Sequence, residues 1–467
     1  MTHSLCRNPL SLLLVAVMLL LGSCRNSTTN IHDLLATLPK DASTVVAFNV
    51  HSSLEKAGCK IDGSKVELSP EMKAALDKTN NPDVRQLFNG EYGIDPEAVV
   101  IFIEGRDVYL TGFLARPDDF VKAVSQQTGA PFEGNGVKTS RNYAYKDNQF
   151  WISLSNDQTI HSSEVERFLS LSERLSFTAN DYADSMVDLS HDIQGWSNIV
   201  GIVNAIGLDF QERQFFRMGL ETLFDDAVDL TFTADFDKGS FTSITQIINS
   251  KGKPAKFLLP ADKIDVSTIS GDNGSAGLFM AVALPEKLMQ EISQQVEGKG
   301  FSLLGAIMPM FKCIDGTSLL RMGIDGRIAG LITTTGQNTA SLTDLLTSQF
   351  GLKVNKDGKI LHFSQGEVSG PLTNNDVAPD FNGATIGMVV SPGMNQGDAS
   401  AHMGLRKISA MLEGYNGSMQ LRITATSNNE KENILISILE AGSMPSVPSS
   451  RANEFPNEIE EHHSPES

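Results

Sequence analysis

The sequence predicts an α+β fold with two tandem halves, each a mainly antiparallel sheet with helices packed on one face. Two observations predict it. Strand pairs joined by short glycine turns recur along the chain, without the regular strand–helix alternation that parallel sheets require. Similar segments also return in the same order in the second part of the sequence. We therefore expect the two halves to be related by duplication.

The stretch 101–129 shows the repeated unit most clearly. Apolar strands at 99–103 and 108–114 are joined by the turn Glu104-Gly105-Arg106. A helix follows from Pro117, because proline and two acidic residues suit a helix start, and it ends at Gly129. The stretch 322–351 repeats this order of strand, glycine turn, strand and helix.

The other expected elements follow from apolar periodicity and from turn residues. Further strands are expected at 41–50, 137–146, 149–154, 199–203, 228–236, 240–248, 277–284, 318–324, 328–334, 384–390, 419–426 and 433–440. Asp237-Lys238-Gly239 is expected to join the strands at 228–236 and 240–248, and 352–363 is expected to be a hairpin that turns at Asp357-Gly358. Further helices are expected at 31–38, 71–77, 162–171, 211–224, 285–296, 301–311, 339–350 and 405–412.

Three pairs of segments support the duplication. Ala47, Val50 and Leu54 match Ala281, Leu284 and Leu288; IEGR at 103–106 matches IDGR at 324–327; and LTFTA at 230–234 matches LRITA at 421–425. Any one pair could arise by chance, but three in the same order favour duplication. The first half carries an extra helix near 162–171, so the copies are unequal.

The repeated Gly-Arg turn has two interpretations. The simpler one is a hairpin in which glycine takes a positive φ and the arginine is solvated. The other is that Arg106 and Arg327 bind a ligand. Hairpin turns are usually structural, so the first interpretation is preferred.

The N-terminus reads as a targeting segment. An apolar run from Leu10 to Leu21 is too short for an ordinary membrane-spanning helix. It ends in Leu-Gly-Ser before Cys24, which resembles a bacterial lipobox. That resemblance implies a lipoprotein signal peptide over 1–23 and acylation of Cys24, which attaches the chain to a membrane. A plain signal peptide with an incidental cysteine is the alternative.

Composition shifts divide the rest of the chain. Residues 24–40 are expected to form a lipid-anchored tether with a short helix, and 41–250 the first half. A stretch with lysines, glycine and prolines marks a linker over 251–274, followed by the second half over 275–441. Residues 442–467 are rich in Ser, Pro and Glu and are expected to be a disordered acidic tail.

Two cysteines, Cys59 and Cys313, remain after cleavage and lipidation. An exported protein can form disulfides, so a bond between them would link the halves, although two isolated buried thiols are the more ordinary state. The pair lacks the spacing of a zinc site, and the histidines are scattered. We expect no metal and no cofactor.

Recognised catalytic motifs are missing. Ser53 and Lys56 have the S-x-x-K spacing of penicillin-binding proteins, but the companion motifs are absent and a helix cap explains them better. The glycine-rich loop 271–277 precedes a strand, so it lacks the geometry that holds phosphate. A formal net charge of -19 argues against binding nucleic acid through a basic patch.

The lipobox, LPKDASTVVAF at 38–48 and LEKAG at 54–58 together resemble a family of uncharacterised lipoproteins from Bacteroides and its relatives, defined as a domain of unknown function. The resemblance implies no catalytic or binding residues. In lipoproteins of the Bacteroidota, an acidic cluster after the lipidated cysteine favours surface export. RNSTTN at 25–30 has no acid. This implies an outer-membrane protein that faces the periplasm.

These observations favour a non-enzymatic envelope lipoprotein that presents a groove or a sheet edge to a protein, glycan or lipid partner. Two tryptophans and six tyrosines supply little for an aromatic glycan platform. The alternative is an envelope hydrolase whose site is built from dispersed residues between the two halves. A purely structural or assembly role is a third hypothesis.

Overall fold

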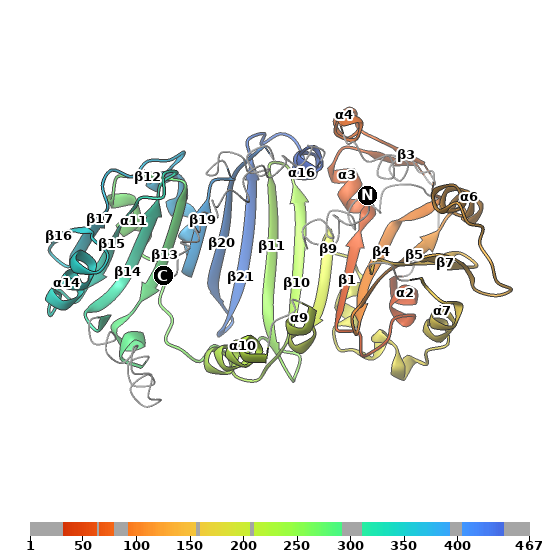
Figure 1. Cartoon of the computed structure of the whole chain (residues 1–467), viewed down its shortest axis with the longest axis horizontal. Coiled ribbons are helices and arrows are strands. Elements are labelled where there is room, and N and C mark those ends of the chain that lie inside the picture. Colours follow the sequence, from red (N-terminus) through yellow and green to blue (C-terminus); the bar gives the residue numbers. More distant parts are fainter. Residues whose placement is uncertain are drawn as a thin grey trace, which may run out of the picture.

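The computed structural model describes residues 31–62, 65–78, 92–155, 159–205, 210–291, 311–392 and 404–442. The predicted signal peptide, Cys24 and the acidic tail from 443 onward lie outside these residues. The fold is α+β and is dominated by one large antiparallel sheet, as predicted. Figure 1 shows this sheet extending along the long axis of the molecule. Among the described residues, no helix combines the length and apolar character needed to cross a membrane.

The hydrogen-bonded pairings run through the sheet in one continuous order, and each pair is antiparallel. The order is β16 (Lys353–Asp357), β17 (Ile360–Ser364), β15 (Ile328–Thr334), β14 (Ile314–Met322), β13 (Leu278–Leu284), β19 (Ala384–Val390), β20 (Leu405–Tyr415), β21 (Ser418–Ser427), β11 (Ser240–Asn249), β10 (Ala227–Asp237), β9 (Ile193–Asn198), β1 (Thr44–Asn49), β4 (Ile94–Glu104), β5 (Asp107–Leu114), β8 (Gln149–Ser153), β7 (Tyr143–Lys146) and β6 (Lys138–Ser140).

The two halves of the sheet have the same strand order. In chain order, the matching strands of the first half are β1, β4, β5, β7, β8, β9, β10 and β11. Their counterparts at the same sheet positions in the second half are, in the same order, β13, β14, β15, β16, β17, β19, β20 and β21. The halves meet where β11 pairs with β21. Ser243 lies opposite Ile423 at the middle of this pairing.

Helices cover both faces of the first half, instead of the one face predicted. On one face, α3 (Val50–Lys56), α4 (Pro70–Lys78), α6 (Pro117–Thr128) and α16 (Ile434–Gly442) pack on a cluster that includes Phe48 and Val99. On the other, α2 (Ile31–Ala36), α7 (Ser162–Leu169) and α8 (Ala183–Val187) pack on a cluster that includes Val45 and Phe102. Alternate residues of each strand therefore point into separate cores.

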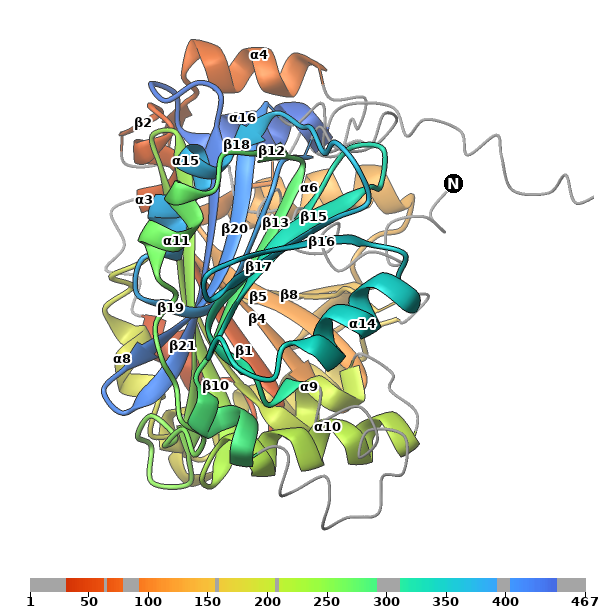
Figure 2. The same ribbon diagram turned by 90° about the vertical axis from the view of Figure 1, so that its left-hand side faces the viewer.

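The second half has fewer described helices. α11 (Val266–Gly271), α15 (Asn374–Val377) and the 3-10 turn η4 (Ala378–Phe381) cover one face, and α14 (Ala340–Ser348) lies on the other. Figure 2 shows α11 and α14 on opposite sides of the strands. Between the halves, α9 (Ile199–Ala205) and α10 (Phe210–Leu223) lie near one end of the strands (Figure 1). The predicted linker contains α11, and much of the helices predicted at 285–296 and 301–311 lies outside the described residues.

Three segments have a different structure from the one predicted. Residues 199–203 form α9, because the preceding polar stretch supplies the central strand β9. Residues 405–412 belong to strand β20, not to a helix. Residues 433–440 lie mostly in helix α16, not in a strand, and the side chain of Asn433 accepts a hydrogen bond from the Leu435 amide at its start.

Two of the three matched segments fall on equivalent elements. Ala47 lies in β1 and Ala281 in β13, and both glycine turns connect equivalent strands. Gly105 and Gly326 have φ values of 63° and 77°, as expected for these turns. The third match is wrong, because LTFTA lies in β10 and LRITA in β21, whose counterpart is β11.

Candidate functional site

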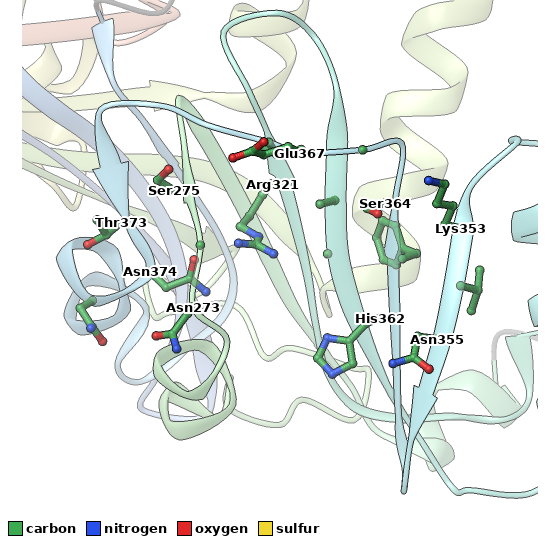
Figure 3. Close-up of a pocket in the computed structure, with 18 residues that line it drawn as sticks. Asn273, Ser275, Arg321, Lys353, Asn355, His362, Ser364, Glu367, Thr373 and Asn374 are labelled. Atoms are coloured by element: carbon green, nitrogen blue, oxygen red, sulfur yellow. The ribbon is translucent and has the colours of Figure 1, made fainter.

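A pocket of about 820 Å³ lies in the second half, beside the strands β14, β15, β17 and β16. The loop between α11 and β12 (Ser275–Ala276) and the segment around β18 (Leu372–Thr373) and α15 form its other wall. Figure 3 shows its labelled side chains. Eleven of its eighteen lining residues have polar or charged side chains; the full lining is Asn273, Gly274, Ser275, Arg321, Ala329, Gly330, Lys353, Val354, Asn355, His362, Phe363, Ser364, Gly366, Glu367, Val368, Thr373, Asn374 and Asn375.

Arg321 projects from β14 into this wall. Its Nη2 lies 3.0 Å from Oδ2 of Asp272, and the two side chains are 11% and 15% exposed. Nε of Arg321 is buried and has no hydrogen-bond partner. The guanidinium lies against Gly274, where a Cβ would be only 1.1 Å from Nη1. The glycine-rich loop therefore has a role that its sequence did not show, which is to make room for Arg321.

Asn374, at the start of α15, is 2% exposed. Its Nδ2 donates a 2.8 Å hydrogen bond to the Ile269 carbonyl, while Oδ1 is buried without a partner. A buried polar atom left unpaired costs about 1–3 kcal/mol. The pocket wall therefore contains both an unpaired donor, on Arg321, and an unpaired acceptor, on Asn374. Buried unpaired groups are few in native proteins, so two of opposite kind in one wall call for an explanation such as a functional role.

The remaining polar groups face the pocket from neighbouring strands. In Figure 3, Arg321 lies between Asn374 on one side and His362 on the other. Nδ1 of His362 is 3.9 Å from Oδ1 of Asp272, and its side chain is 37% exposed. Lys353 and Asn355, on β16, are exposed. Hydrogen-bonding groups thus surround the pocket on several sides.

The strand register shows what occupies the same place in the first half. With Ala47 and Ala281 taken as equivalent, the β1–β4 and β13–β14 pairings place Arg321 where Phe102 lies. Arg321 is paired with Ala329, and Phe102 with Tyr109. Phe102 and Tyr109 are fully buried and stacked, with ring centroids 5.1 Å apart. The arginine and the alanine of the pocket therefore stand where the first half has two packed aromatic rings.

The same comparison applies to the next strand. Leu331 is paired with His362 where Thr111 is paired with Trp151, and Trp151 is fully buried. Three buried aromatic positions of the first half thus correspond to Arg321, Ala329 and His362.

A helix accounts for the difference in coverage. After β8 the first half continues into α7, whose Phe168 packs edge-on against Phe102 with ring centroids 5.4 Å apart. After β17 the second half runs from Ser364 to β18 without an intervening helix. The extra helix predicted near 162–171 is therefore present, and the pocket opens where its counterpart would lie.

The first half contains a second polar cluster, around Lys56 of α3. Its Nζ lies 2.9 Å from Asp192, 3.2 Å from Asp235 and 3.6 Å from Asp237. Burial alone would lower the pKa of Lys56, but hydrogen bonds and charge from Asp192 and Asp235 outweigh it and raise this pKa. Asp192 is fully buried and also accepts hydrogen bonds from the Ser52 hydroxyl and the Phe236 amide.

This arrangement explains the S-x-x-K spacing structurally. The Ser53 hydroxyl donates to the Asn49 carbonyl of its own helix, and Asn49 rather than a serine caps that helix. Lys56 is directed to the carboxylates, so these contacts give no support to a serine–lysine catalytic pair.

The two cysteines lie apart in the fold. Cys59 belongs to the core shared by α3 and α6, whereas Cys313 packs with Leu342 under α14. Both are buried and neither forms a disulfide bond, and burial raises the pKa of each thiol. The suggested bond between them is absent, because the residues belong to separate hydrophobic clusters.

We expect the two thiols to be protected until the chain unfolds. Without reductant, the lipidated protein should show almost no reaction with a thiol reagent in the native state and two reactive thiols per chain in guanidinium chloride. The expected count comes from Cys59 and Cys313, with Cys24 acylated. A count of zero after unfolding would contradict this prediction, because it would mean that the two are bonded.

The two arginines of the glycine turns are the other candidates from the sequence. Arg106 and Arg327 are exposed on their turns, and Nε of Arg327 lies 3.3 Å from Asp325. Among the residues that the structure describes, no group of three or more His, Cys, Asp or Glu could hold a metal ion.

The comparisons with known proteins are sparse. The chain matches no protein-family model and no curated protein. Two solved structures, described as "Structure of crystal form I of TP0453" and "Structure of crystal form III of TP0453", are 9% and 8% identical to it. Each match covers 76% of this chain and 97% or 98% of the other, with TM-scores of 0.27 and 0.29. Scores this low support no argument about fold or function.

The sequence alone did not indicate the pocket. One usable signal was Arg321 itself, a charged residue directly after two leucines and on the same face as the buried Leu319. The glycine-rich loop was a second signal. Neither indicates a site until the strands bring them together.

Proposed function

We propose that the protein is a lipid-anchored cell-envelope protein that binds a small polar ligand in the Arg321 pocket and is not an enzyme. The signal peptide and Cys24 support attachment to a membrane, and the tether without acidic residues supports the periplasmic face of the outer membrane. A protein or glycan of the envelope would supply or share the ligand. The acidic chain supports no role with nucleic acid.

One observation carries this proposal. Three strand positions carry buried aromatic residues in the first half, namely Phe102, Tyr109 and Trp151. The equivalent positions in the second half carry Arg321, Ala329 and His362, which line a cavity. The aromatic residues would give a more stable core at these positions, because an unpaired buried donor and an unpaired buried acceptor both lower the stability of the fold. The presence of polar residues with unpaired atoms around one cavity favours a binding role for that cavity.

The alternative, an envelope hydrolase with a site between the halves, has less support. The Lys56 cluster offers charged groups, but they bond to one another, and Asp192 is inaccessible. Such internal pairing is typical of a structural ion cluster. The pocket itself lies within the second half, away from the β11–β21 junction.

We also propose that the two halves arose by duplication. The common strand order, the equivalent Ala47 and Ala281, and the two equivalent glycine turns support it. In this view, one copy gained α7 and a filled core, while the other kept or acquired an open pocket.

Affinity capture tests the function. The tagged, lipidated protein would be purified from its own envelope, and bound small molecules identified by mass spectrometry. An Ala329→Tyr variant introduces the ring that Tyr109 supplies in the first half, and should reduce the captured ligand about tenfold. Ala340→Tyr, on the exposed start of α14, is the matched control and should retain it. Capture of no ligand together with hydrolysis of a defined polymer would refute the proposal.

A further inference from the structure

Among the polar side chains that line the pocket, most are neutral groups that both donate and accept hydrogen bonds. Four amides and three hydroxyls contribute: Asn273, Asn355, Asn374, Asn375, Ser275, Ser364 and Thr373. Side chains of this kind recognise a ligand through many directional hydrogen bonds, with little contribution from charge.

Formal charges in and beside the pocket balance. Arg321 and Lys353 are opposed by Glu367 and by Asp272, which is already paired with Arg321. A multivalent anion such as a phosphate ester would require an excess of cationic donors. The balance favours a ligand with little net charge.

The two unpaired atoms restrict the ligand further. Nε of Arg321 can only donate a hydrogen bond, whereas Oδ1 of Asn374 can only accept one. A carboxylate or phosphate only accepts, so it leaves the asparagine oxygen unpaired. A hydroxyl both donates and accepts, so a ligand with several hydroxyls can pair both atoms once the Arg321 and Asn374 side chains turn toward it, because neither atom is accessible to water in this structure.

From these observations we infer that the ligand is a short saccharide, an inference that rests on the proposed function. The volume of about 820 Å³ falls in the range of small-molecule sites, roughly 300–1,000 Å³. Ala329 and Val368 add apolar surface to the lining, which suits the C–H groups of a sugar ring, whereas the Phe363 ring packs over Gly330 on the opposite face of the sheet. The saccharide lies along β14, β15 and β17, with its hydroxyls toward Arg321, His362 and Asn374.

An array of mono- to tetrasaccharides, probed with the detergent-solubilised lipidated protein, tests this inference. Calorimetry then measures the affinity of each saccharide found, and inorganic phosphate serves as the anionic probe. We expect at least one saccharide to bind, with an affinity about tenfold lower in Ala329→Tyr and also reduced in Asn355→Ala. Asn355 is exposed, so its truncation should leave the fold intact even if the tyrosine perturbs it. Ala340→Tyr should bind as the unmodified protein does.

The outcomes separate this inference from the proposed function. Failure of every saccharide, or binding of phosphate alone, overturns the saccharide assignment. If affinity capture then yields another polar ligand, and Ala329→Tyr reduces its capture, the proposed function stands although the saccharide assignment fails. Saccharide binding that none of the pocket variants affects overturns both, because the ligand then binds elsewhere.

Discussion

Replacing Asp192 by alanine should lower the free energy of unfolding by about 3–5 kcal/mol, as expected when one partner of a buried ion pair is removed. The Asp192 carboxylate is fully buried, and it accepts hydrogen bonds from Lys56 at 2.9 Å and from the Phe236 amide at 2.7 Å. The variant leaves the amide unpaired and Lys56 with fewer counter-charges. Equilibrium denaturation with urea measures the change.

Asp237 provides the matched control for this experiment. Its side chain is 57% exposed and lies 3.6 Å from the same Lys56 nitrogen. Its replacement by alanine should cost no more than about 1 kcal/mol, because exposed ion pairs contribute little. Equal losses in the two variants would show that burial does not determine the strength of this cluster.

Phe102→Ala should destabilise the protein by about 3–5 kcal/mol, the usual cost of truncating a buried aromatic residue. Phe102 is fully buried and contacts the rings of Tyr109 and Phe168. The truncation leaves a cavity beneath α7, in the place where the second half has its pocket. Thermal and urea denaturation measure the loss.

Phe350→Ala is the control for the truncation, because that side chain is 58% exposed and should lose little stability. A Phe102→Ala variant as stable as the control would contradict the view that the first half is a filled version of the pocket.

Local sequence signals predicted the hairpins well. Asp237-Lys238-Gly239 and Asp357-Gly358 close hairpins where the turn residues indicated, and α6 runs from Pro117 to Thr128 before Gly129. These predictions succeeded because glycine, proline and the helix-end acids act within a few residues of their own position.

The central strands could not be predicted in this way. β9 is built from IQGWSN, in which Gly195 leaves room for the Phe232 ring, since a Cβ there would lie 2.1 Å from it. The β-branched run that follows looked more like a strand, yet it forms α9. Tertiary packing overrides local propensity where a strand lies between two neighbours.

The pocket was beyond prediction for a related reason. Arg321, His362 and Asn374 come from three elements, and only the strand register brings them together. Their meaning depends on a comparison with Phe102 and Trp151, which requires the correct pairing of both halves. The partial matches between the halves gave the order of elements but not this register.

A crystal structure of the lipidated protein with its best-bound saccharide tests the central claim most directly. We predict electron density for the saccharide beside Arg321, His362 and Asn374, with hydrogen bonds to the two atoms that are now unpaired. The corresponding place around Phe102 in the first half should be filled by its own side chains. A saccharide bound elsewhere while this pocket stays empty would contradict the account.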